Sequence, residues 1–133
     1  MLGSEITSIP GSGKYFLGGV VTYSNESKED LLFVPRSEIK RYGAVSKDVA
    51  VFMAFGVREI FASDVSISIT GIAGPDGGTS DKPVGLVWIG ISTRNGTTAK
   101  KFNFNGNREE IRKSAVNKAM ELLMDLIVSD LKF

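Results

Sequence analysis

The sequence has 133 residues, of which 42% are hydrophobic and 23% charged, with a formal net charge of +1. This length and composition fit one globular domain, and the near-zero charge excludes the basic surface typical of nucleic-acid binding. The absence of cysteine and histidine excludes disulfides, thiolate or imidazole zinc sites and Ser-His-Asp catalysis. No apolar run approaches the ~18 residues that span a membrane, and no signal-peptide pattern opens the chain. We therefore expect a cytoplasmic protein without a nucleic-acid or membrane partner.

Hydrophobic periodicity and turn residues predict an α/β domain. The expected elements, in chain order, are a helical segment at 1–9, a strand at 17–23, helices at 26–32, 35–42 and 46–61, strands at 65–70, 84–93 and 98–104, and a helix at 108–130. Period-two alternation supports the strands, and apolar residues three and four apart support the longer helices. We therefore expect a single domain, residues 1–133, in which helices cover a mixed β-sheet.

A few residues predict where the helices begin, end and pack. Asn25 is the expected N-cap of the first short helix, Gly43 closes the second, and Ser46 caps the third. The third helix carries an apolar stripe that includes Gly56, and a glycine there favours close packing against a sheet. The other members of the stripe are Val49, Phe52, Met53, Val57, Ile60 and Phe61.

Two strand features are specific enough to predict geometry. The run at 17–23 combines apolar, β-branched and aromatic residues, which predicts a strand buried on both faces. Asn95-Gly96 lies between two alternating runs, which predicts a β-hairpin with a two-residue type I′ turn.

The stretch that begins at Thr70 contains four glycines, Gly71, Gly74, Gly77 and Gly78, between two predicted strands. Glycine lets a ligand approach the main chain closely, and successive N–H groups in such a loop form concave anion sites. We therefore interpret this stretch as one wall of a site for a phosphorylated or carboxylated small molecule. A mobile connection between two strands is the alternative, which composition alone does not exclude.

Five motifs occur in chain order, namely Gly18–Lys28, Gly43–Ser46, Thr70–Thr79, Lys82–Gly85 and Gly106–Arg112. Together they closely resemble the CinA C-terminal domain family, which includes nicotinamide mononucleotide deamidases of the PncC type. The resemblance covers the whole chain with nearly family-like spacing. It implies hydrolysis of the nicotinamide mononucleotide carboxamide to nicotinic acid mononucleotide and ammonia, and it implies no cofactor because the reaction uses water.

The sequence departs from the family pattern at two places. Family members normally begin with a strand and a Thr-Ala-Glu-Ser-Cys-Thr-Gly-Gly loop, whereas this sequence starts, at Met1, within the helix that follows. The family usually carries a serine at the fourth position of the turn Pro10-Gly11-Ser12-Gly13, where this sequence has Gly13, with Ser12 as the nearest hydroxyl. Without the first strand, we expect an unprotected sheet edge and a homo-oligomer.

The resemblance implies catalytic roles for three residues. Tyr23 and Lys28 match the family's catalytic tyrosine and lysine, and Ser12 is the candidate nucleophile. A buried lysine can lose its proton near neutral pH and act as a general base, while a tyrosine can relay the proton or hold the developing oxyanion. The alternatives are a tyrosine that ends a core strand, a solvated helix lysine, and a turn serine that bonds local backbone groups.

The resemblance also implies substrate contacts. Arg108 and Arg112 lie four residues apart at the start of the last helix, where they could hold a phosphate together with the glycine-rich stretch, and Asn25 could orient the carboxamide. Ordinary ion pairs of the arginines, and the cap already assigned to Asn25, are the alternatives. Asp76 and Asp81 could bind Mg²⁺, but solvated loop acids are the simpler interpretation, so we expect no metal.

We therefore expect a nucleotide amidase whose partner is a small-molecule nucleotide similar to nicotinamide mononucleotide. The alternative is a domain of the same family that binds nucleotide or assembles without catalysis, and both departures from the family pattern favour it. The two interpretations differ in whether Lys28 has a chemical role.

Overall fold

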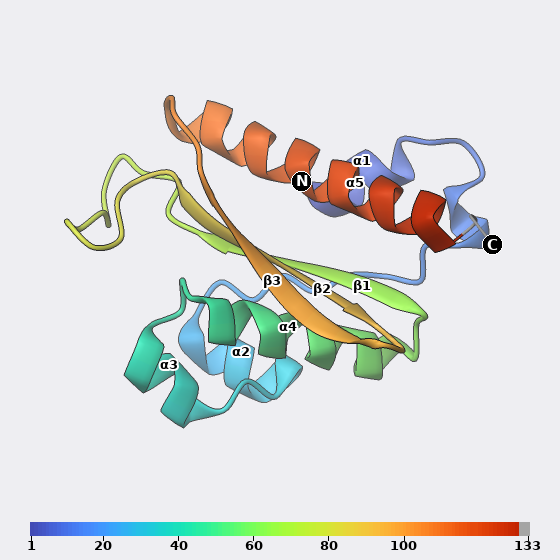
Figure 1. Ribbon diagram of the computed structural model, residues 1–133, viewed down its shortest axis with the longest axis horizontal. Coiled ribbons are helices and arrows are strands. Elements are labelled where there is room, and N and C mark those ends of the chain that lie inside the picture. The colour runs from blue at the N-terminus through green and yellow to red at the C-terminus, as the bar shows by residue number, and fades with distance from the viewer. Residues whose placement is uncertain (131–133) are drawn as a thin grey trace.

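The computed structural model describes residues 1–130 as three layers (Figure 1). Helices α1 and α5 lie on one face of a β-sheet, and α2, α3 and α4 lie on the other. The helical elements are α1 (Leu2–Thr7), the short 3-10 helix η1 (Ser12–Lys14), α2 (Asn25–Leu32), α3 (Arg36–Tyr42), α4 (Lys47–Phe61) and α5 (Arg108–Asp130). The strands are β1 (Val65–Gly71), β2 (Leu86–Thr93) and β3 (Gly96–Asn103).

The sheet has three strands in the order β1-β2-β3, and both strand pairs are antiparallel. The predicted single α/β domain with a helix-covered sheet is confirmed. The sheet is antiparallel rather than mixed, because no parallel strand joins it in the described part of the chain. In the observed register, Thr70 lies opposite Trp88, and Trp88 lies opposite Lys101, so the three side chains form one row across the sheet.

The predicted strand at 17–23 is wrong. This segment has no regular secondary structure, and it runs as an extended chain from η1 to α2 (Figure 1, blue). Leu17, Val21 and Tyr23 are 60%, 88% and 86% exposed, whereas Val20 packs against the core. Strand propensity reflects how well a side chain fits a pleated, half-buried surface, and within the described residues no neighbouring strand offers this segment such a surface.

Each face of the sheet has its own hydrophobic core. On the α4 face, the buried residues are Leu32, Val34, Ile39, Val49 and Met53. On the α5 face, they are Val87, Ile89, Ile111, Ala115 and Ala119. The apolar face predicted for α5 therefore packs on the sheet at Ile111, Ala115 and Ala119, whereas Ile127 near its end is 42% exposed. The apolar stripe predicted for α4 packs instead against the α2–α3 layer, where Val49 and Met53 meet Leu32, Val34 and Ile39, and Ile60 is 44% exposed.

The α4 layer is also attached to the sheet by hydroxyl groups of β1. Ser66 Oγ donates to the carbonyl of Ala54 at 2.5 Å, and Ser68 Oγ donates to the carbonyl of Ala50 at 2.7 Å. Gly90 on β2 faces the same stretch of helix, and a Cβ atom there would overlap the Ala50 carbonyl. The polar face of β1 is therefore packed against a helix instead of facing solvent.

Two of the three predicted helix-end residues are confirmed. Ser46 Oγ accepts from the backbone N–H of Val49 at 3.3 Å and caps α4, and Gly43, with φ of 81°, ends α3. The predicted cap of α2 is wrong by one residue. Ser24 Oγ accepts from Ser27 N–H at 3.1 Å, so Asn25 is the first helical residue instead.

The predicted hairpin between β2 and β3 is confirmed, but its turn is shifted by one residue. Thr93 pairs with Gly96, so the two-residue loop is Arg94-Asn95. A type I′ turn needs positive φ at both central residues, and no residue of this loop has one. The hydroxyl of Thr93 instead accepts from the backbone N–H of Asn95 at 3.1 Å.

Gly56 allows a close contact, although not the predicted contact with the sheet. A Cβ atom at this position would overlap the backbone carbonyl of Leu32 at the end of α2. The glycine therefore lets α2 pack directly on α4.

We expect Gly56→Ala to lower the free energy of unfolding by about 1–3 kcal/mol, even though alanine is the better helix former. The backbone of Leu32 must move to admit the new methyl group. The measurement is urea unfolding followed by circular dichroism. Gly13→Ala is the matched control, because nothing lies within 4 Å of its added Cβ. A Gly56→Ala variant as stable as the wild type would contradict the close contact between α2 and α4.

Candidate functional site

The glycine-rich connection at 72–85 joins β1 to β2 and projects from one end of the molecule (Figure 1, left). Gly74 and Gly77 have φ of 78° and 92°, a region that side-chain-bearing residues rarely adopt. At Gly78, an added Cβ would come within 2.8 Å of the backbone nitrogen of Val84. The backbone conformation of the connection therefore requires glycine at Gly74, Gly77 and Gly78, three residues that were predicted to bind a ligand.

Specific hydrogen bonds fix the shape of this connection. Thr79 N–H donates to the carbonyl of Lys82 at 2.8 Å, and Lys82 Nζ donates to the carbonyl of Tyr42 at the end of α3. From the start of α5, Arg108 Nη1 donates to the carbonyl of Gly74 at 2.9 Å. The structure therefore brings Arg108 and the glycine-rich stretch together.

The two arginines at the start of α5 differ in their contacts. Arg108 bonds a backbone carbonyl, whereas Arg112, one helical turn later, is exposed and forms no ion pair within residues 1–130. The expected alternative, pairing of these arginines with helix acids, is also not observed in that part of the chain, where Glu109 pairs with Lys113 at 3.3 Å. The guanidinium group of Arg112 remains accessible to an anion.

Thr70 and Gly71 lie where β1 leads into this connection. The hydroxyl of Thr70 is buried and donates to the carbonyl of Ala44 at 2.8 Å, which attaches the strand end to the α3–α4 junction. At Gly71, an added Cβ would come within 2.8 Å of the Val87 side chain. In this structure both residues have packing roles that position the loop.

Lys28 is a buried ionisable side chain in α2. It is 6% exposed, and its Nζ donates to the carbonyl of Thr22 at 2.8 Å. Burial lowers the pKa of the Lys28 ammonium below its ordinary value of 10.5, because removal from water disfavours the charged form. The structure therefore excludes the solvated helix lysine that the sequence left open.

Tyr23 and Asn25 lie in the segment that leads into α2, close in sequence to Lys28. Tyr23 is 86% exposed, so it does not end a core strand. Asn25 is exposed in the first turn of α2. The three residues belong to one end of α2, where Tyr23 and Asn25 are exposed and Lys28 is buried.

Ser12 lies apart from this group. It is buried in η1, where its backbone carbonyl accepts from Tyr15 and Phe16. η1 contacts α1, which packs on α5, whereas Lys28 belongs to α2 on the opposite face of the sheet. Within one chain the structure does not place the Ser12 hydroxyl beside the Lys28 amine.

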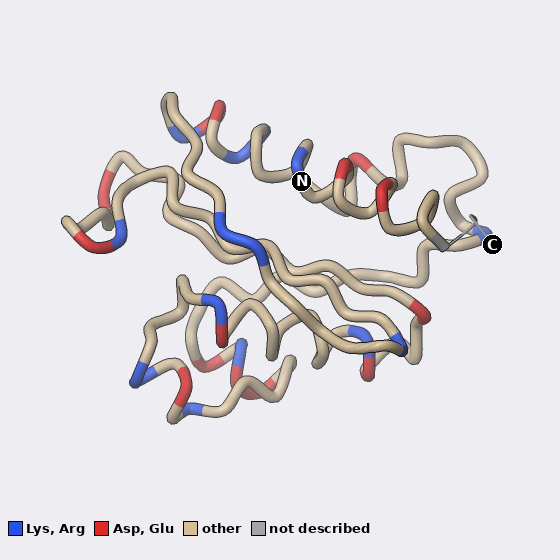
Figure 2. The backbone as a smooth tube through the Cα atoms, viewed as in Figure 1, with Lys and Arg blue, Asp and Glu red and all other residues tan. Residues whose placement is uncertain are grey.

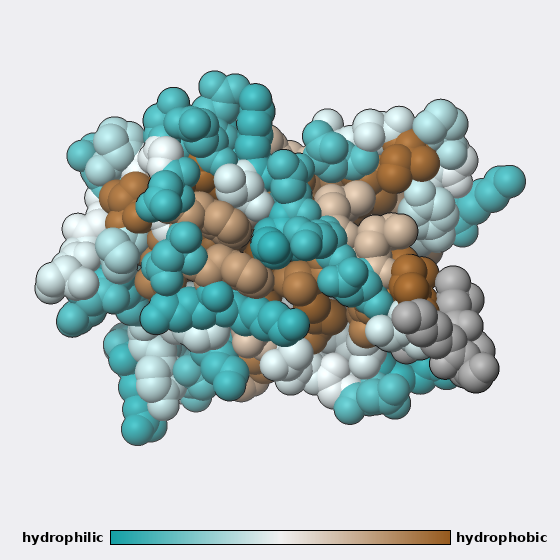
Figure 3. All heavy atoms as spheres, turned by 45° about the horizontal axis from the view of Figure 1, so that its top comes forward, coloured by the Kyte–Doolittle hydropathy of each residue, from teal (hydrophilic) through white to brown (hydrophobic). Residues whose placement is uncertain are grey.

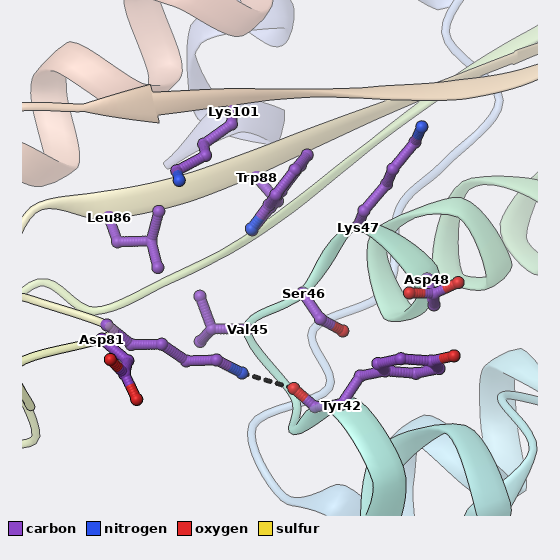
Figure 4. Close-up of a pocket in the computed structure, with 10 residues that line it drawn as sticks. Tyr42, Val45, Ser46, Lys47, Asp48, Asp81, Leu86, Trp88 and Lys101 are labelled. Atoms are coloured by element: carbon purple, nitrogen blue, oxygen red, sulfur yellow. Dashed lines mark hydrogen bonds between the residues drawn. The ribbon is translucent and has the colours of Figure 1, made fainter.

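A shallow groove of about 300 Å³ opens on the α4 face of the sheet. Its walls come from the α3–α4 junction, the end of the glycine-rich connection and the strands β2 and β3 (Figure 4). The lining side chains include Trp88 and Lys101, which neither periodicity nor motif had singled out. The predicted hairpin could have identified this pair, because strand pairing places residues of β2 and β3 side by side on one face of the sheet.

Neither a metal site nor a membrane span is found in the described part of the chain. Within residues 1–130, no three acidic side chains gather where they could hold a metal ion, and Asp76 and Asp81 are both exposed. Among the helices over this range, none combines the length and the apolar character needed to cross a bilayer.

The fold and the site together define an α/β domain with a glycine-rich connection, an arginine bound to it and a buried lysine. The family described as the CinA C-terminal domain matches residues 1–127. The chain therefore belongs to the CinA C-terminal domain family, as the sequence motifs predicted.

Similar proteins of known sequence and structure agree with this assignment. A CinA-like protein of Geotalea uraniireducens is 49% identical over 97% of this chain, which covers 31% of that protein. A putative competence-damage inducible protein of Desulforudis audaxviator is 42% identical over 96% of this chain, and the match covers 31% of that protein. The chain thus spans about a third of the length of these curated relatives.

The solved structures give the same result for the fold. The competence/damage inducible protein CihA from Agrobacterium tumefaciens superposes with a TM-score of 0.91 at 37% identity, covering 94% of this chain and 77% of that one. A CinA superfamily protein from Escherichia coli gives 0.90 at 34% identity, covering 94% and 73%.

The burial of Lys28 predicts a pH dependence of stability. Because its pKa is lowered in the folded state, the unfolded chain holds the proton to higher pH, and the free energy of unfolding rises as pH increases through the folded-state pKa toward 10.5. Lys28→Met removes this pH-dependent contribution to the free energy of unfolding and leaves every other titratable group in place. We expect the stability of the wild type, measured by urea unfolding, to rise relative to that of Lys28→Met as the pH increases toward 10.5. Parallel pH profiles of the two proteins would contradict the burial of the Lys28 ammonium.

Proposed function

We propose that this domain hydrolyses the carboxamide of a nicotinamide mononucleotide-like nucleotide, releasing ammonia. The observation that carries the proposal is Lys28, whose amine is buried, bonded to the Thr22 carbonyl and depressed in pKa. Membership in the CinA C-terminal domain family supports it. A lysine whose pKa is lowered by burial is better suited to act as a general base than a solvated lysine.

In the proposed reaction the neutral amine of Lys28 takes a proton from a water molecule. The water oxygen attacks the carboxamide carbon, and the hydroxyl of Tyr23 donates to the oxyanion that forms. The C–N bond then breaks, the nitrogen leaves as ammonia with the proton from Lys28, and the carboxylic acid that remains loses its proton to solvent. Water is preferred to Ser12 as the attacking group because the serine lies on the other side of the sheet.

The start of α5 is a candidate site for the substrate phosphate, but within one chain it lies on the face of the sheet opposite Lys28, so the phosphate and the carboxamide would be held by two copies of the chain. The helix N-terminus and the accessible guanidinium of Arg112 both favour an anion there. The glycine-rich stretch, held by Arg108 at the Gly74 carbonyl, would pass beside the ribose, and Asn25 would bond the carboxamide.

The direct test is ammonia release from nicotinamide mononucleotide by this chain. We expect Lys28→Ala to reduce the rate by about 10²–10⁴-fold, the usual contribution of a general base, and Ser12→Ala to retain it. Lys40→Ala, which changes an exposed lysine of α3, is the matched control. Circular dichroism confirms that each variant is folded. Absence of ammonia with the folded wild type, or full activity of Lys28→Ala, would refute the proposal.

A second candidate function, assembly without catalysis, is favoured by the surface of the domain. Of the two edge strands, β3 carries exposed lysines, which discourage edge pairing, whereas β1 contains no charged residue. The α5 side also exposes apolar groups, shown in brown along the middle of Figure 3. Met124, Ile127 and Val128 are 55%, 42% and 44% exposed on that helix.

These surfaces predict self-association of the isolated domain. We expect light scattering to give a mass above the 14.3 kDa of one chain, rising with protein concentration. Ser68 lies within β1 and its hydroxyl is already bonded, and Ile67 packs against the core. The test variant is therefore Val65→Lys at the first residue of β1, which adds a charge to the edge strand and should lower the mass. A concentration-independent monomer would exclude this function.

A further inference from the structure

The groove on the α4 face combines apolar, aromatic and charged side chains that converge from three separate segments. Residues of the α3–α4 junction form one wall, residues of the glycine-rich connection form another, and the strands form the floor. Its volume of about 300 Å³ lies at the lower end of the range for small-molecule sites. None of the residues to which the sequence assigned catalysis or substrate binding lines it.

Trp88 and Lys101 are the central pair of this groove. They lie directly opposite each other on β2 and β3, so their side chains share one face of the sheet. In Figure 4 the indole nitrogen and the Lys101 ammonium both point to the side of the groove that lies above Leu86 and Val45. Within residues 1–130, neither of these two donors has a hydrogen-bond or ion-pair partner. The groove therefore presents an aromatic ring, two free donors and an apolar floor together.

The charge of the lining favours an anion. Three lysines and two aspartates line the groove, namely Lys47, Lys82, Lys101, Asp48 and Asp81, and none of them forms an ion pair with another in the described chain. Lys101 belongs to the blue stretch of β3 in Figure 2, a strand without an acidic residue. An anionic group beside Lys101 therefore meets an uncompensated cation.

We propose that this groove is a second ligand site, which binds a nucleoside monophosphate. The base stacks on the Trp88 indole, a contact worth about 1–3 kcal/mol in other proteins. The phosphate accepts a charge-assisted hydrogen bond from Lys101. The apolar side chains of Val45 and Leu86 form the surface beneath the ribose. The site is independent of the proposed amidase reaction, since it uses neither Lys28 nor the start of α5.

The single tryptophan of the sequence makes this site directly observable. Trp88 is the one tryptophan in the chain, so all tryptophan emission reports on the groove. We expect adenosine 5′-monophosphate to change this emission saturably, with a midpoint at or below about 1 mM. Adenosine should bind more weakly, and inorganic phosphate alone should produce no change. An unchanged emission with the monophosphate, or an equal effect of phosphate alone, would overturn the proposal.

Neighbouring lysines of β3 supply matched variants. Lys101 faces the groove, whereas Lys100 faces the opposite side of the same strand. We expect Lys101→Gln to weaken binding about five- to tenfold through loss of one charge-assisted contact, while Lys100→Gln leaves it unchanged. Both variants keep the strand and lower the net charge equally. Equal weakening by the two would show non-specific charge attraction and would refute the site.

Discussion

The contact between α4 and the sheet is the constraint on which the rest of the structure depends. Two serine hydroxyls of β1 donate to carbonyls of α4 that lie one helical turn apart, at Ala50 and Ala54. A carbonyl oxygen has two lone pairs, so it can accept this bond in addition to its helical one. Gly90 removes the side chain that would hold the helix away. The serine hydroxyls on this face of β1 thereby find hydrogen-bond acceptors within the protein.

This contact also determines where the functional groups lie. The same row of β1 hydroxyls ends at Thr70, which bonds the Ala44 carbonyl and fixes the α3–α4 junction. The junction supplies the Tyr42 carbonyl that holds Lys82 of the glycine-rich connection. A displacement of α4 therefore moves the junction, the connection and the Trp88 groove together. The connection keeps its shape because its two ends and its middle are attached to the rest of the domain.

The sequence predicted the elements in which apolar residues recur at a regular spacing, and it missed the features that depend on contact with a distant segment of the chain. Alternation located β1, and the apolar stripes located α4 and α5. The segment at 17–23 has the same local preferences as a strand, but pairing requires a neighbour that the local sequence does not contain. The predicted turn would have placed Trp88 opposite Asn103, whereas the shift by one residue places it opposite Lys101. The groove could not be predicted, because its walls meet only after the chain has folded.

Burial of the Lys28 side chain both lowers the pKa of its ammonium group and makes the residue costly to the stability of the fold. A buried ammonium is destabilising unless it is paired, and in the described chain it has a single carbonyl partner at Thr22 and no carboxylate. An apolar side chain would fill this position of α2 at lower cost. The penalty is relieved when the ammonium loses its proton, and the product is the neutral amine that a general base must be.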